Sequence, residues 1–176
     1  MPPHAAEPLR NVVLLDLPDV DGYVASHPER VARVLPRLDA LLVTTSVDKY
    51  ADRVLYDALR ALPHATHSLV FVLNAVDRLA AADRARVLED FRATLRTHGG
   101  MRDAVPLALS ARDALSPDER TRGASGLSTL RARIEALGTD AERRHILAAN
   151  ADAASKRVRD MLDAVLPAAA TEAWLT

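Results

Sequence analysis

The stretch that most constrains the fold lies at residues 68–77, where Ser-Leu-Val-Phe-Val-Leu runs directly into Asn-Ala-Val-Asp. The apolar run is rich in Val, Leu and Phe and is short for a helix. It therefore favours a strand that is buried on both faces of a parallel sheet. Open α/β sheets bind ligands at the carboxyl ends of their strands. We therefore predict that the tetrad from Asn74 to Asp77 is a ligand loop.

A simpler interpretation of the same tetrad stays open. Asn and Asp are common just before helices, because their side chains can accept hydrogen bonds from the first free N–H groups. Asn74 and Asp77 could then do no more than cap a helix that begins near Ala80.

The rest of the chain alternates apolar runs with helical patterns. Such alternation predicts right-handed βαβ units, and hence an α/β fold with three α/β/α layers around a mostly parallel sheet of about four strands. Pro106 suggests that the last strand lies at an edge. The predicted strands are 11–16, 40–46, 68–73 and 104–109, and the predicted helices are 28–38, 50–62, 81–97, 126–137 and 141–166.

Two helices and one loop carry more detailed expectations. In the helix at 50–62, Val54, Leu55, Ala58 and Leu62 are predicted to share the buried face, and the polar segment 113–125 is predicted to be a loop. The last helix is predicted to bury one apolar stripe, formed by Ala154, Val158, Met161, Leu162 and Val165.

Polar side chains follow three of the predicted strands. They form the runs Asp16-Leu-Pro-Asp19, Asn74-Ala-Val-Asp77 and Ser110-Ala-Arg112. Because parallel strands present their carboxyl ends at one edge of a sheet, we expect these runs to lie near one another.

In this order the runs resemble motifs of the P-loop GTPase superfamily, in its dynamin-like and Era-like bacterial branch. Asn74-Ala-Val-Asp77 is similar to the guanine-reading Asn-Lys-X-Asp loop, with Ala75 in place of the Lys. Residues 16–21 resemble the Asp-Leu-Pro-Asp-X-Asp run of those proteins, and Lys49-Tyr-Ala-Asp52 resembles another of their motifs. The resemblance covers residues 11–137.

The resemblance implies a guanine nucleotide, GTP or GDP, as ligand. Asp77 would accept two hydrogen bonds from the guanine edge, and Asn74 would brace the loop. Ser110 and Ala111 match the Ser-Ala motif that tightens the base pocket. Ala75 removes a Lys stem that lies over the base in the family, so affinity is expected to fall.

The resemblance also implies a Mg²⁺ ion. Asp16 matches the acid that holds this ion through water, since a hard cation prefers oxygen ligands. Asp19 stands where the family usually has Gly near the γ-phosphate, and a carboxylate there would repel phosphate unless it points away.

The family's phosphate-binding motif, Gly-X-X-X-X-Gly-Lys-Ser/Thr, does not occur in the sequence. The chain therefore resembles the carboxyl-terminal two-thirds of a GTPase domain. Residues 1–138 would be a partial G domain, and 139–176 a helical extension packed on it or projecting from it. We expect the chain alone to be inactive as a GTPase.

Two other functions remain. The chain could be a non-catalytic pseudo-GTPase that works as an interaction module, which the missing phosphate loop favours. The run around Asp16 also resembles the phosphoacceptor loop of response-regulator receivers, although the acidic pair and the Lys that a receiver needs are not found.

Composition limits the partners. The 176 residues carry 23 basic and 24 acidic side chains and no cysteine. The balance gives no general attraction to nucleic acid or anionic lipid, so no nucleic acid partner is expected and membrane association is not indicated. No signal peptide or membrane span is recognised, and we expect a cytoplasmic protein.

The sheet itself suggests a protein partner. In the complete family fold a further strand separates those at 11–15 and 40–46, so these two must either pair directly or keep unpaired edges that invite self-association. Val12, Leu14, Leu42 and Thr44 are then expected to be unusually exposed for strand residues.

Overall fold

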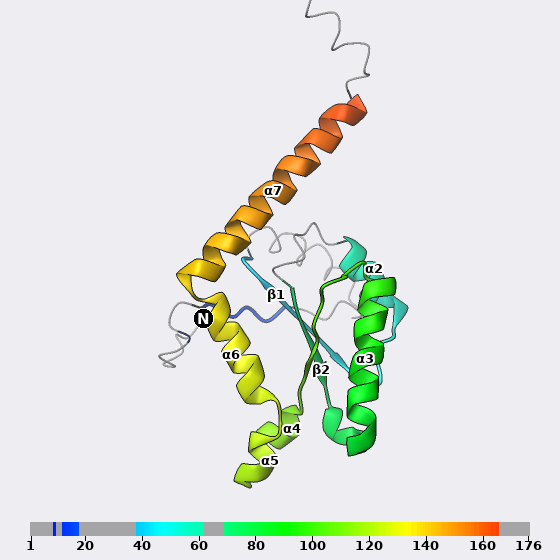
Figure 1. The fold of residues 1–176 in the computed structure, drawn as a ribbon, viewed down its shortest axis with the longest axis vertical. Coiled ribbons are helices and arrows are strands. Elements are labelled where there is room, and N and C mark those ends of the chain that lie inside the picture. The colour runs from blue at the N-terminus through cyan, green and yellow to red at the C-terminus, as the bar shows by residue number, and fades with distance from the viewer. Residues whose placement is uncertain (1–8, 10–11, 18–37, 62–68, 166–176) are drawn as a thin grey trace, which may run out of the picture.

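The computed structural model describes residue 9 and residues 12–17, 38–61 and 69–165, and it has a mixed α/β fold (Figure 1). The predicted helix at 28–38 lies outside the described residues. In chain order the elements are β1 (Leu41–Ser46), α2 (Arg53–Ala61), β2 (Leu69–Asn74), the 3-10 turn η4 (Val76–Arg78), α3 (Ala81–Thr97), β3 (Leu107–Ala108), α4 (Ala111–Ala114), α5 (Glu119–Gly123), α6 (Leu127–Leu137) and α7 (Asp140–Val165).

The three described strands form one parallel sheet in the order β1-β2-β3. β1 pairs with β2 from Leu41 opposite Leu69 to Ser46 opposite Asn74. β3 pairs with β2 over two residues only, and it lies at the edge, as Pro106 predicts. The predictions of a parallel sheet and of a central strand at 68–73 are confirmed.

β2 is buried because its alternating side chains meet helices on opposite faces of the sheet. Phe71 and Leu73 pack in one cluster with α2 and α3, where Phe91 and Leu95 are fully buried. Val70 and Val72 pack in a second cluster with Leu130 of α6. Successive residues of a strand point to opposite faces, so a run that is apolar at every position needs cover on both.

The apolar run at 11–16 is not a strand, which corrects the prediction. Described residues 12–17 have no regular secondary structure, and Val13 is 74 % exposed. Val12 N–H donates to Leu9 O, and the Val12 side chain lies close to Gly138. An apolar run becomes a strand only where another strand accepts its hydrogen bonds, and among the described residues β1 pairs only with β2.

Consequently the predicted direct pairing of 11–15 with 40–46 is wrong for the part of the chain described. The expected exposure is confirmed for Leu14, Leu42 and Thr44, whereas Val12 is half-buried. β1 therefore presents an apolar residue, Leu42, to solvent on one of its faces.

The segment 113–125, predicted to be a loop, instead contains the end of α4 and the whole of the short helix α5. Asp118 caps α5, because its carboxylate accepts the N–H of Thr121 at 2.7 Å. Hydrogen bonds from Thr121, first from its side chain and then from its backbone N–H, lower the pKa of Asp118. The segment has no apolar stripe that would predict a helix. What defines α5 is its N-cap residue.

The buried face of α2 is one residue away from the prediction. Tyr56 and Leu59 are buried, whereas Val54 is exposed. Tyr50, from the Lys-Tyr-Ala-Asp run, packs edge-on against Phe91 and donates a hydrogen bond of 2.7 Å to Asp90 of α3. α2 therefore buries Tyr56 and Leu59, and Leu55 packs against the same cluster.

α7 corrects another prediction. The stripe expected to be buried, Ala154, Val158, Met161, Leu162 and Val165, is exposed along its whole length. Ile146 is buried near the start of the helix, and beyond it α7 extends away from the sheet (Figure 1). Within the described residues, no helix is long and apolar enough to cross a membrane.

Stability should fall at high pH because of Tyr56. Burial raises its pKa from 10.0 to about 12, and the neutral hydroxyl donates to Tyr50 O at 2.5 Å. Above pH 10 the unfolded chain releases this proton while the folded chain keeps it, so the free energy of unfolding decreases as pH rises towards 12. Urea unfolding from about pH 9 to about pH 11 should show a smaller loss in Tyr56→Phe than in wild type. Equal losses would contradict this.

Candidate functional site

The side chain of Asn74 joins two loops at the carboxyl end of the sheet. Its Oδ1 accepts the N–H of Ala75 at 2.7 Å, which shapes its own loop, and the N–H of Ala111 at 3.1 Å, which begins α4. Asn74 ends β2 and Ala111 follows β3, so one amide oxygen bridges neighbouring strands. A half-buried amide that satisfies two backbone donors holds both loops in one relative position.

Asp77 is fixed by a second bridge between the same loops. Ser110 Oγ donates to Asp77 Oδ1 at 2.9 Å and also accepts the N–H of Asp113 at 3.0 Å, which caps α4. Ser110 is buried, and the side chain of Asp77 is only 8 % exposed. A carboxylate that is buried and hydrogen-bonded on one oxygen presents the other in a fixed direction.

That second oxygen, Oδ2, faces the Arg112 guanidinium, with Nε at 3.5 Å. The Arg112 side chain is largely exposed, so water screens the ion pair and little free energy holds the guanidinium in place. Asp77 Oδ2 is thus an acceptor that an exposed and weakly held side chain faces.

The interpretation of Asn74 and Asp77 as caps of the following helix is wrong. α3 begins after Ala80, and its N-cap makes no side-chain hydrogen bond. The 3-10 turn η4 also has no side-chain cap. Both polar side chains instead point to the loop after β3, which a simple capping role does not require.

Ala75 has a left-handed backbone, with φ 63° and ψ 30°. Among the described residues it is the only non-glycine with positive φ. This conformation costs an L-residue free energy and is rare outside Gly, Asn and Asp. The Asn74 bridge compensates by binding the Ala75 N–H, so a strained turn sits at the centre of the candidate site.

Sequence reasoning missed the contribution of Ser125 and Gly126. Ser125 O accepts the N–H of Ser110 at 2.8 Å, which ties the start of α6 to the end of β3. Gly126 has φ 84°, and a Cβ there would lie 2.1 Å from Ala108 O. The Ser-Gly pair before an apolar helix was a turn signal, but the close approach to β3 depends on the folded backbone.

The other predicted site residues are not joined to this loop pair. Asp16 is exposed, and no hydrogen bond or ion pair links it to the described residues. Asp19 lies outside the residues that the structure describes. In the described part of the chain, no group of three His, Cys, Asp or Glu residues could hold a metal ion. A hard divalent cation needs several oxygen ligands, so these residues alone do not fit Mg²⁺.

The arrangement is a mixed α/β domain with a polar loop pair at the carboxyl end of a parallel sheet. Comparisons with protein-family models, with curated proteins and with solved structures give no match. The loop pair is therefore the feature of the described structure that bears most directly on function.

Replacing Ala75 with Gly should stabilise the fold by about 0.5–1 kcal/mol, because Gly adopts positive φ without strain. Ala85→Gly is the matched control: Ala85 is exposed within α3, where the same change should destabilise by about 1 kcal/mol. Urea unfolding of both variants measures the difference. Destabilisation by both changes to a similar extent would show that position 75 carries no backbone strain.

Gly126→Ala should destabilise by at least about 2 kcal/mol, because the new methyl group meets the Ala108 carbonyl and the backbone keeps positive φ. Gly123→Ala is the control, since a Cβ there meets nothing within 4 Å. That change lies in α5 and should be neutral or slightly stabilising. Thermal unfolding of the pair tests the prediction, which fails if the two variants behave alike.

Proposed function

We propose that the chain is a GTP-binding protein of the P-loop GTPase type, and that the loop pair of Asn74, Asp77, Ser110 and Ala111 reads the guanine base. One observation carries the proposal. Four residues singled out by the motif resemblance, from loops more than thirty positions apart, meet through direct hydrogen bonds in which Asn74 braces both loops and Ser110 orients Asp77.

The chemistry of guanine fits this acceptor. Its ring N–H and exocyclic amino group are donors on one edge, whereas the matching edge of adenine lacks that pair. A carboxylate is an acceptor only and can take both hydrogen bonds. Because the Asp77 side chain is buried, losing the guanine bonds would leave it poorly solvated, which favours discrimination against bases without the donors.

The fold proposed with this function is a three-layer α/β/α sandwich, a partial Ras-like domain over residues 1–138. The two apolar clusters on opposite faces of β2 support it. Residues 139–176 would form the helical extension, and α7 beginning at Asp140 agrees with that division.

The full reaction of the family would be attack of water on the γ-phosphate, in which positioning and charge neutralisation do most of the work. The 176 residues carry no phosphate-loop motif, so we propose that this chain alone does not hydrolyse GTP. Asp16 stays the proposed water-mediated contact for Mg²⁺, whose other ligands would have to be oxygens that the described residues do not supply. Asp19 stays the proposed neighbour of the γ-phosphate.

A second candidate is a non-catalytic interaction module derived from the same fold. Two observations favour it: Arg112 faces the free oxygen of Asp77, and Ala75 has no stem to cover a base. In that case the loop pair is a rigid structural joint, and Leu42 with the edge of β1 is the surface for a protein partner or a second copy.

Nucleotide titrations separate the two candidates. The base loop alone should bind GTP, GDP and guanosine with similar dissociation constants on the order of 1 mM, because the phosphates add little. Adenosine should bind at least about tenfold more weakly. Calorimetry or chemical-shift titration measures both constants, and equal binding of adenosine and guanosine would reject base reading.

Variants of the loop sharpen the same test. Asp77→Ala should abolish the preference for guanine, while Ala75→Lys should strengthen guanosine binding by restoring a stem over the base. Asp103→Ala, at an exposed acid in the loop before β3, is the control and should change neither constant. If all three variants bind as wild type does, the interaction module is the better description.

A further inference from the structure

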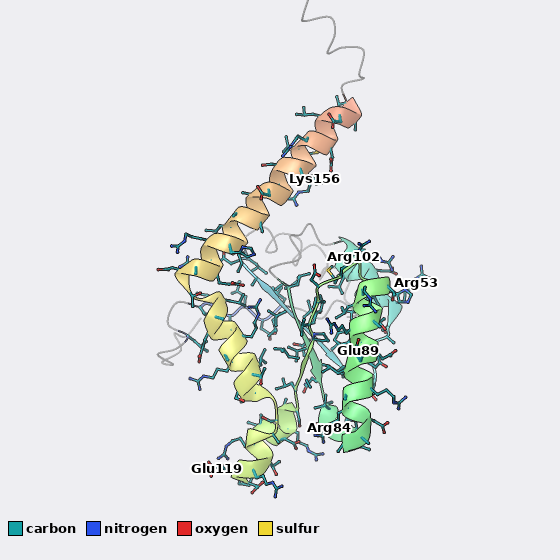
Figure 2. The ribbon with its side chains drawn as sticks, in the orientation of Figure 1. Arg53, Arg84, Glu89, Arg102, Glu119 and Lys156 are labelled. Carbon is teal, nitrogen blue, oxygen red and sulfur yellow. The ribbon has the colours of Figure 1, made fainter. Side chains whose placement is uncertain are left out.

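The outer part of α7 carries an apolar stripe that nothing described in this chain covers. Leu147, Val158, Met161, Leu162 and Val165 are each more than half exposed. Figure 2 shows the side chains along this part of the helix, Lys156 among them, with no other described element beside them. A helix of 26 residues that buries Ile146 and extends away from the sheet keeps this stripe in water.

The stripe has the spacing of a coiled-coil seam. Its positions are separated by four, three, four, three and four residues, which is the a/d pattern of a heptad repeat over about 27 Å of helix. The residues at these positions are Leu147, Ala151, Ala154, Val158, Met161 and Val165. Leu162, which is also 51 % exposed, lies beside this seam and would pack along the edge of a partner helix.

The charges of α7 avoid the seam. Lys156 and Asp160 pair with each other at 2.7 Å, four residues apart, and Asp152, Arg159 and Asp163 also lie off the a/d positions. Among the charged residues between 147 and 165, Arg157 flanks the seam directly, and its aliphatic stem can lie along an apolar partner. The seam is therefore free of charges that pairing would have to desolvate.

We propose that α7 pairs with α7 of a second copy of this chain, antiparallel, about a two-fold axis near residue 156. Reversing the stripe about that point places Leu147 opposite Val165, Ala151 opposite Met161 and Ala154 opposite Val158 of the second copy. Each alanine then faces a large side chain of the second copy, so the facing pairs along the seam have similar total volumes. Under a two-fold axis the same stripe is used by both copies, so the stripe must be complementary to itself.

The parallel arrangement is worse for the same residues. It would place Ala151 against Ala151 and Ala154 against Ala154, so two neighbouring layers of the seam would be underfilled, while the large side chains would face one another elsewhere. Close packing favours layers of equal volume. The antiparallel pair also sets the helix dipoles head to tail, which adds a small attraction. This surface is separate from the loop pair, so the inference does not depend on nucleotide binding.

Sedimentation equilibrium of the full chain tests the pairing. Dimers should form reversibly between about 1 μM and about 1 mM, and Val158→Glu with Met161→Glu should weaken association at least about a hundredfold, because each copy would bury charges. Leu115→Glu is the control: it changes a strongly exposed apolar residue outside α7 and should leave the dimer intact. A chain that stays monomeric throughout, or a dimer that the α7 variant does not weaken, overturns the proposal.

Disulfide trapping tests the orientation, since the sequence contains no cysteine. Leu147→Cys and Val165→Cys should form a mixed disulfide when the two variants are oxidised together, and neither should cross-link efficiently alone. Circular dichroism confirms that each variant keeps its helix content. Efficient cross-linking of each variant with itself, without the mixed product, would show a parallel pair and overturn the antiparallel one.

Discussion

The burial of β2 on both faces is the constraint on which the described structure depends. Phe71 and Leu73 need cover from α2 and α3, and Val70 and Val72 need cover from α6, so one six-residue strand decides where three helices lie. β1 and β3 then complete its hydrogen bonds on either side. Because the strand is fixed so completely, the loop that follows it starts from a rigid point, which a site of defined geometry requires.

From that point, the geometry of the candidate site is set by hydrogen bonds rather than by side-chain packing. Asn74 closes the left-handed turn at Ala75 and the start of α4, while Ser110 holds Asp77 and is itself tied to Ser125. The loops after β2 and β3 are thus one unit. Strain at Ala75 and the close approach at Gly126 are tolerated because these bonds over-determine the backbone.

The sequence predicted well those elements whose pattern and neighbours agree. Residues 81–97 form the expected helix, with Phe91 and Leu95 inward, and β2 lies where the apolar run places it. The prediction of a strand at 11–16 was wrong because residues 12–16 have no strand to pair with among the described residues. The prediction that α7 buries its apolar stripe was wrong, because periodicity shows that one face of a helix is apolar but does not show what covers that face.

By itself, the sequence determined most of the helices, the parallel arrangement of the central strands and which residues belong to the loop pair, Asn74, Asp77, Ser110 and Ala111. These features follow from local patterns, because the spacing of apolar residues and the residues typical of turns can be recognised within a few positions of the sequence. Only the tertiary structure decided that Asn74 reaches Ala111 and that Ser110 reaches Asp77, that Gly126 must be a glycine, and that α7 leaves its stripe in solvent. Each of these depends on the distance between segments far apart in the chain, which no local pattern specifies.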